Sequence, residues 1–189
     1  MAIFYRWKIH LLQIALVAPV AMAAEDSLLA HWRFDETSGA VAYSSSGYTL
    51  PGQLINGGLW GPGLIDGALH LDGVNDYVSF GDPPELRLTS SMTIALWMYA
   101  DRMQAADTVV SRNAGFGDVG WCIYLENGYP MIKIGQPGEK SKTSTRTAGT
   151  KVTAGSWYHL AAVYNANART LELFVNGERS LGLLNGMVP

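Results

Sequence analysis

The stretch "MTIALWM", Met92–Met98, alternates along its whole length: its even positions are large and apolar, whereas its odd positions are smaller or mixed. A period of two is typical of a β-strand with one buried face, because successive side chains of a strand point to opposite sides. In the rest of the chain no apolar stripe with a period of 3.6 residues persists for three turns. The sequence therefore predicts a fold built from strands.

Short β-branched and aromatic runs, separated by Gly, Pro, Asn and Asp, fill the chain after residue 23. This pattern predicts an antiparallel two-sheet sandwich. Asn127-Gly128 and Asn176-Gly177 predict tight hairpin turns, since Asn and Gly tolerate positive φ. From Gly135 to Gly155 the sequence is polar, which predicts either a long loop or a frayed edge hairpin. The expected strands are Leu28–Phe34, Gly52–Ile55, Ala68–Leu71, Asp76–Phe80, Met92–Tyr99, Thr108–Arg112, Trp121–Glu126, Pro130–Ile134, Trp157–Asn165 and Thr170–Val175.

The first 23 residues have the organisation of a secretory signal peptide. Arg6 and Lys8 precede an apolar run of about ten residues, and Ala21-Met22-Ala23 has the small-x-small pattern of a cleavage site. A membrane anchor is the alternative, but the run is shorter than the roughly 20 residues that cross a bilayer. We therefore expect residues 1–23 to be removed and residues 24–189 to form one domain, secreted or at the cell surface, without a membrane span.

The mature chain is acidic and has a single cysteine. Of the 13 Lys and Arg residues, Arg6 and Lys8 leave with the leader, and the remaining 11 face 16 acids, a net charge of 11 − 16 = −5. Such a balance, without a basic stripe, argues against a nucleic acid partner. Because Cys122 has no second cysteine to pair with, we expect it to serve as a small buried hydrophobic residue on a strand.

Several runs that occur in this order together carry a resemblance. They are "LLAHWRFDETSG" (Leu28–Gly39), "GALHLDGVNDYVSFGDPPELRL" (Gly67–Leu88), "MTIALWMYAD" (Met92–Asp101), "WYHLAAVYN" (Trp157–Asn165) and "LELFVNGER" (Leu171–Arg179). With these runs the chain closely resembles the laminin-G-like jelly-roll modules of the concanavalin A-like lectin and glucanase superfamily over about residues 28 to 182. This resemblance implies a jelly-roll sandwich, but it leaves the function open, because the superfamily contains lectins, adhesion modules and hydrolases.

The sequence departs from the family pattern in two places. Where the family commonly has Asp-Ser-Ser-Gly, this chain has Ser44-Ser45-Ser46-Gly47, and a hydroxyl is a poorer calcium ligand than a carboxylate. A closing strand resembling Gly-x-Ile-Asp-Glu-Val-x-Ile does not occur before Pro189. We therefore expect an incomplete calcium site and a jelly roll lacking its last strand or strands, within a longer chain of several domains.

The acidic segment Asp72-Gly73-Val74-Asn75-Asp76 has two interpretations, a cation loop or a turn. Apolar strand residues flank it on both sides, which predicts a hairpin connection. Asp and Asn stabilise turns through hydrogen bonds to the backbone without a cation, and the spacing does not match an EF-hand loop. The sequence favours a structural turn, with Asp72 and Asp76 as candidate calcium ligands; no other cofactor is indicated.

The tryptophans fall into two groups. Trp32, Trp97 and Trp157 lie in alternating strands, where a large aromatic side chain usually fills the space between two sheets. Trp60 and Trp121 lie among glycines, which predicts exposed loop positions. An exposed indole stacks on a pyranose ring, so the sequence predicts a glycan site at Trp60 and Trp121, with Asn113 and Asp118 as nearby polar groups.

Catalytic signatures are absent from the sequence. Glycosidases of this fold carry paired carboxylates on one strand, and here the acids are scattered. His159 lies between apolar neighbours, with no nucleophile motif nearby, and is expected to be structural. The sequence thus predicts a non-catalytic module, not an enzyme, which binds polysaccharide or glycoprotein glycans or mediates adhesion. A structural spacer in a larger secreted protein is the first alternative. A divergent glycoside hydrolase, with acids from different strands, is the second.

Overall fold

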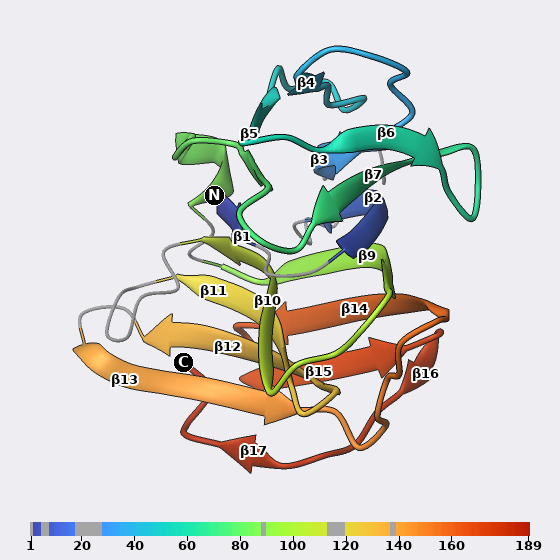
Figure 1. Cartoon of the computed structure of the whole chain (residues 1–189). Helices are drawn as coiled ribbons and strands as arrows, with labels where there is room; N and C mark the ends of the chain where they lie inside the picture. Colours follow the sequence, from blue (N-terminus) through green and yellow to red (C-terminus); the bar gives the residue numbers. More distant parts are fainter. Residues whose placement is uncertain (1, 5–7, 18–27, 88–89, 113–119, 137–138) are drawn as a thin grey trace.

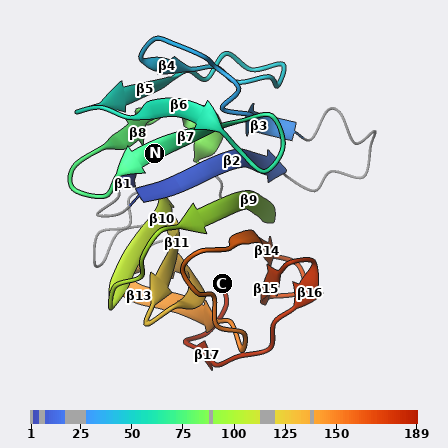
Figure 2. The same cartoon turned by 45° about the vertical axis from the view of Figure 1, so that its right-hand side comes forward.

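Two antiparallel β-sheets form the molecule; Figure 1 labels most of their strands, and Figure 2 also labels β8. The structure is a computed structural model, and it describes residues 2–4, 8–17, 28–87, 90–112, 120–136 and 139–189. The only regular helix in these ranges is a single 3-10 turn, η1, at Pro84–Leu86. The prediction of an all-β antiparallel sandwich is confirmed.

The first sheet, sheet A, has nine strands. Its order from one edge to the other is β17 (Leu184–Asn185), β13 (Glu139–Thr147), β12 (Tyr129–Gln136), β11 (Trp121–Glu126), β10 (Ala106–Arg112), β1 (Ala2–Phe4), β8 (Tyr77–Ser79), β5 (Gly52–Ile55) and β4 (Val41–Ala42). From β10 to β13, strands that are neighbours in sequence are also neighbours in space, and the two-residue turn at Asn127-Gly128 connects β11 to β12.

The second sheet, sheet B, has eight strands. Its order is β16 (Glu178–Arg179), β15 (Thr170–Val175), β14 (Trp157–Asn165), β9 (Met92–Ala100), β2 (Lys8–Val17), β7 (Gly67–Asp72) and β6 (Leu59–Pro62), with β3 (Leu28–Trp32) paired to β2 beside β7. Strand β9 therefore lies in the middle of this sheet, with β14 on one side and β2 on the other.

The core lies between the sheets, and Trp32 is one of its largest fully buried side chains. The Trp32 side chain has no exposed surface, packs 4.0 Å from the Phe80 ring between centroids, and donates from Nε1 to the Leu50 carbonyl at 2.7 Å. The core role predicted for Trp32 is confirmed. The same role is wrong for Trp97 and Trp157, which are only half-buried, because they alternate with inward-facing residues and point away from the core.

Local signals predicted most of the strands. Four have the expected bounds: Gly52–Ile55, Trp121–Glu126, Trp157–Asn165 and Thr170–Val175. Both Asn-Gly pairs form the two-residue turns expected of them, with positive φ at all four residues. In the polar segment the hairpin alternative is right, since β13 pairs with β12, but β13 is not an edge because β17 covers it.

The acidic segment is a turn, but it is not a hairpin. Strand β7 before it pairs with β2 and β6 in sheet B, whereas β8 after it pairs with β1 and β5 in sheet A. Residues 73–76 therefore carry the chain from one sheet to the other. The expected hairpin is wrong because strand patterns show where strands end but not which neighbours they find.

The predicted leader contributes two strands. Residues 2–4 form β1, which lies between β8 and β10 in sheet A, and residues 8–17 form β2, which lies between β7 and β9 in sheet B. Removal of residues 1–23 from the mature chain stays a prediction. In the unprocessed chain these residues join the two halves of each sheet.

Burial in β9 predicts unequal effects for two adjacent substitutions. Leu96 is 1% exposed, so Leu96→Ala should lower the free energy of unfolding by about 2–5 kcal/mol. Trp97→Ala removes a larger side chain, but from the half-buried outer face, so its cost should be near the average for point substitutions, about 1 kcal/mol. Urea denaturation of the two variants checks the order. A larger loss for Trp97→Ala would place its ring in the core.

Candidate functional site

An aromatic pocket lies on the outer face of sheet B. It has a volume of about 570 Å³, is open to solvent and is mainly apolar. This volume falls in the range of small-molecule sites, roughly 300–1,000 Å³. Its lining residues, which define the aromatic pocket below, are Leu64, Trp97, Trp157, His159, Asn176 and Gly177.

The floor of the aromatic pocket follows from strand alternation. The inward positions of β9 and β14 are buried, so the residues between them face outward. Antiparallel pairing places His159 directly opposite Trp97, and Trp157 directly opposite Tyr99. The ring centroids are 5.2 Å apart in the first pair and 5.6 Å apart in the second, both in tilted arrangements. Such pairs hold the rings in place, so the floor is preorganised.

One wall is the turn between β15 and β16. Asn176 has a φ of 52° and Gly177 a φ of 81°, the left-handed conformation that this pair adopts in hairpin turns. The Asn176 backbone N–H donates to the His159 carbonyl at 2.8 Å, and Asn176 Oδ1 accepts the His159 backbone N–H at 2.9 Å. These two bonds fix the turn against β14 and place a polar amide beside the aromatic floor.

The opposite wall comes from the turn between β6 and β7. Leu64 is 46% exposed and contributes an apolar side chain to the pocket. The Gly63 backbone N–H donates to the Asp66 carbonyl at 3.0 Å, which closes the turn. Arg33 contacts Asp66 at 3.3 Å and Asp35 at 2.9 Å, so the turn is also tied to the segment after β3. The two walls therefore belong to different halves of the sandwich.

The charge of the pocket depends on His159. Burial lowers the pKa of its imidazole below the ordinary 6.5. The ring is therefore neutral at physiological pH. None of the six lining residues described carries a carboxylate, so this part of the lining provides no pair of acids for glycosidic bond cleavage.

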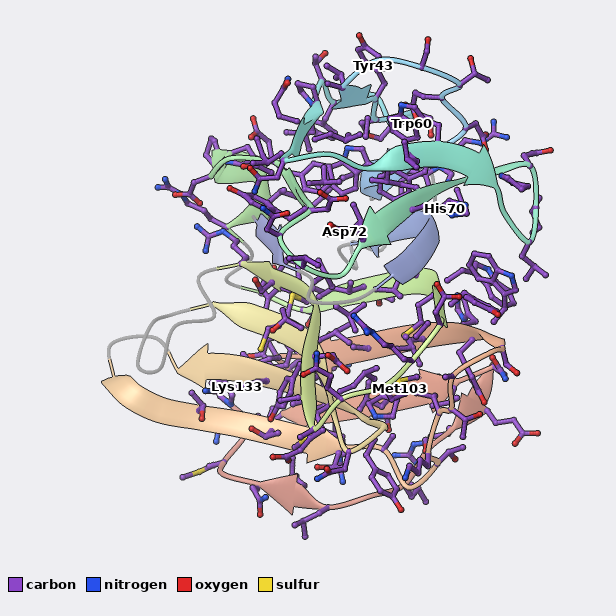
Figure 3. All side chains as sticks on the ribbon, in the orientation of Figure 1. Tyr43, Trp60, His70, Asp72, Met103 and Lys133 are labelled. Carbon is purple, nitrogen blue, oxygen red and sulfur yellow. The ribbon has the colours of Figure 1, made fainter. Side chains whose placement is uncertain are left out.

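The structure separates the residues predicted to bind a glycan. Trp60 lies on β6, partly buried against the core, and its Nε1 donates to the Gly39 carbonyl at 2.8 Å. Figure 3 labels Trp60 beside the ribbon of β6. Trp121 is 3% exposed, and its exposure is wrongly predicted. Glycines precede it, but it begins β11 and points inward in step with Ile123 and Leu125. Asn113 and Asp118 lie outside the described residues.

Asp72 and Asp76 act as acceptors for the turn between the sheets. Asp72 Oδ1 accepts backbone N–H groups from Val74 at 2.8 Å, Asn75 at 3.3 Å and Asp76 at 3.4 Å. These bonds, the one from Val74 first, hold the Asp72 pKa below its usual value. The buried Asp76 carboxylate accepts the Asp72 backbone N–H at 3.1 Å. A role for either residue in calcium binding stays a prediction.

No larger metal-binding cluster is found in the described ranges, where no group of three or more His, Cys, Asp or Glu side chains could hold an ion.

The expectation for Cys122 is confirmed: it is free and buried, and burial raises its thiol pKa to about 11.

Sequence reasoning missed the aromatic pocket although a signal for it was present. If Ile94, Leu96 and Met98 face the core, then Trp97 must face outward. The same alternation across Leu160 and Ala162 turns Trp157 and His159 outward. The contribution of Leu64 has no such signal, because it depends on how β6 and β7 are placed relative to β9.

A comparison with protein families identifies the chain. The family model of the concanavalin A-like lectin/glucanases superfamily, of the laminin G type, matches residues 72–182, more than half of the chain. The chain therefore belongs to this superfamily, as its runs predicted, and its two antiparallel sheets agree with a concanavalin A-like sandwich. No curated protein and no solved structure matches the chain. Membership makes the chain a binding or structural module, of a type that is generally not catalytic.

The described residues contain no helix of the length and apolarity needed to span a membrane.

The lowered pKa of His159 gives a testable dependence on pH. A nuclear magnetic resonance titration of the imidazole should give a value below 6.5. Because the unfolded chain then takes up the proton first, the contribution of this residue to stability is complete above about pH 6.5 and declines as the pH falls toward the folded value. His159→Gln should remove that part of the pH dependence. A His159 pKa at or above 6.5 in the folded chain would contradict the conclusion that burial disfavours the charged imidazole.

The turn bonds of Asp72 predict a structural role that needs no cation. Asp72→Ala should lower the free energy of unfolding by about 1 kcal/mol, because three backbone N–H groups lose an acceptor, and Asp72→Asn should lower it less. Addition of 1 mM Ca²⁺ should leave the melting temperature unchanged. A site with a Kd near 10 μM would add about 2.7 kcal/mol at that concentration. A rise of several degrees, reversed by a chelator, would show Asp72 and Asp76 to be ligands.

Proposed function

We propose that the chain is a secreted, non-catalytic module that binds glycans, of a polysaccharide or a glycoprotein, in the aromatic pocket. The observation that carries this proposal is the pair of outward-facing indoles, Trp97 and Trp157, held by contacts with His159 and Tyr99. The leader pattern of residues 1–23 supports secretion. Outside the cell, a secreted module would meet glycans of the cell surface or of the extracellular matrix.

The chemistry of the aromatic pocket suits a neutral sugar. A pyranose presents an apolar C–H face, which an indole covers, and hydroxyl groups at its edge, which an amide can hydrogen-bond. Trp97 and Trp157 supply the first kind of contact, and the Asn176 turn supplies the second. Because the pocket is open, much of the sugar would stay in water, so we expect a modest affinity, about millimolar to micromolar.

The absence of acids among the lining residues supports binding without hydrolysis. Retaining and inverting glycosidases both need two carboxyl groups on either side of the scissile bond. On the same sheet, the Glu172 carboxylate is paired with the Arg179 guanidinium, an arrangement that suits a surface contact better than proton transfer. A bound sugar would therefore leave the pocket unchanged.

A glycan array probed with the full chain, followed by titration calorimetry of the best ligand, tests the proposal. Trp97→Ala and Trp157→Ala should each weaken binding by at least about tenfold, or 1.4 kcal/mol. Tyr43→Ala is the matched control, because Tyr43 is an aromatic residue that is 65% exposed and does not line the pocket. It should bind as the parent does, and circular dichroism should show that all three variants stay folded.

Two outcomes would contradict the proposal. If no glycan binds, the module acts as a spacer or takes another partner, such as a neighbouring domain. If Trp60→Ala abolishes binding while Trp97→Ala does not, then the site lies on β6, where the sequence placed part of it.

A further inference from the structure

Two polar side chains of the aromatic pocket carry hydrogen-bonding groups that no described residue satisfies. One is Asn176, in the turn between β15 and β16, and the other is His159, on β14 beside β9 (Figure 1). In a binding site, the groups that folding leaves unpaired are those available to a ligand. The unused donors and acceptors of these two residues therefore describe the polar part of the ligand.

The Asn176 amide has a fixed orientation. The His159 backbone N–H needs an acceptor and finds Asn176 Oδ1 at 2.9 Å, so the carbonyl end of the amide is turned toward β14. The Asn176 backbone N–H donates in return to the His159 carbonyl at 2.8 Å, which holds the turn in place. Asn176 Nδ2 then has two N–H bonds without an acceptor among the described residues. The pocket wall thus offers a positioned donor, which suits an oxygen acceptor on the ligand.

The imidazole of His159 supplies the complementary group. Its ring packs 5.2 Å from the Trp97 ring between centroids, and neither ring nitrogen has a hydrogen-bond partner within the described residues. Because burial lowers the His159 pKa, the neutral ring has one N–H donor and one acceptor nitrogen at neutral pH. Tryptophan side chains only donate, and Asn176 Oδ1 is already used. Among the lining side chains, the imidazole therefore provides the free acceptor.

Charged groups near the aromatic pocket do not line it. The His159 pKa is lowered by burial rather than by a charged neighbour. Two of the surrounding carboxylates have basic partners, since Glu172 pairs with Arg179 and Asp66 pairs with Arg33. The titratable side chains that the surrounding elements carry are Tyr99 on β9, Glu172 on β15, Glu178 and Arg179 on β16, and Asp66 in the turn between β6 and β7.

An acetamido group matches this combination of contacts. Its carbonyl oxygen accepts, as the Asn176 amide requires, and its N–H donates, as the neutral imidazole requires. Its methyl group is apolar and suits the indoles and the Leu64 side chain. A hydroxyl group at the same place can make one or both hydrogen bonds, but it has no apolar part to cover these side chains.

We propose that the aromatic pocket selects N-acetylhexosamine residues, with the acetamido carbonyl on Asn176 Nδ2, the acetamido N–H on the His159 ring, and the methyl group and sugar face on the indoles. This inference rests on the proposed function and names the class of sugar that the site takes. Asn176 and His159 are then the residues that determine specificity, whereas Trp97 and Trp157 supply contacts common to many sugars.

The same contacts couple binding to a proton. A protonated imidazole has two donors and no acceptor, so the acetamido N–H loses its partner when His159 takes up a proton. The ligand therefore binds the neutral ring, and its affinity should fall as the pH drops through the His159 pKa of the folded chain. Above that pKa the affinity should be constant.

Titration calorimetry of the full chain with two tetrasaccharides tests the proposal. Chitotetraose and cellotetraose have the same linkage and length, and they differ in having an acetamido or a hydroxyl group at C2. Chitotetraose should bind at least about fivefold more tightly at about pH 8, the effect of hydrogen bonds of ordinary strength. This preference should decline in acid in step with the His159 titration, followed by nuclear magnetic resonance.

Three variants separate recognition from folding. Asn176→Asp keeps an oxygen for the His159 backbone N–H and tolerates the left-handed turn, but it has no donor for the acetamido carbonyl, so the preference should disappear. His159→Phe keeps an aromatic floor and should also lose it. His159→Gln retains an acceptor that does not titrate in this range, so the preference should persist without the acid decline. Circular dichroism checks that each variant is folded.

Tyr43→Ala, outside the pocket, is the matched control and should keep both the preference and its pH dependence. Equal or tighter binding of cellotetraose, or glycan-array ligands without acetamido groups, would overturn the assignment while glycan binding itself stands. A preference unchanged in both Asn176→Asp and His159→Phe would also overturn it, because other residues would then recognise the acetamido group. If no glycan binds, the proposed function fails as well.

Discussion

The two-residue alternation of β9 is the constraint on which both the core and the aromatic pocket depend. Ile94 and Leu96 enter the core because they face one side, and for the same reason Trp97 faces solvent. A shift of one residue in the pairing would reverse every side chain of the strand. The register between β9 and β14 therefore fixes stability and the candidate binding surface together, and changes in one affect the other.

Local features of the fold could be predicted from the sequence. Alternation located the strands, and the Asn-Gly pairs located two turns, because both signals depend on residues that are adjacent in the chain. The burial of Trp32 also followed from its strand. The acidic segment was recognised as a turn stabilised by Asp72, since an Asx turn is closed within four residues.

What the sequence could not supply is the choice of neighbours over long distances. The turn after Asp72 crosses between sheets because β7 and β8 find partners elsewhere, and no pattern within residues 67–80 records this. The aromatic pocket needs Leu64 opposite Trp97, residues that come from opposite sides of β2. The burial of Trp121 has a different reason: glycines precede it in the sequence, but the alternation of its own strand, β11, turns its side chain inward.

The reactivity of the chain's single thiol can report on how often sheet A opens. Cys122 lies in β11 between Ser111 of β10 and Lys133 of β12, is 6% exposed, and its pKa of about 11 leaves almost no thiolate at neutral pH. Alkylating reagents and oxidants react with thiolates, so burial and the raised pKa should make this sulfur slow to react while β11 stays packed in the sheet. The rate at which the Cys122 sulfur is modified therefore reports on the opening of sheet A. The chain has no other cysteine that could contribute to the signal.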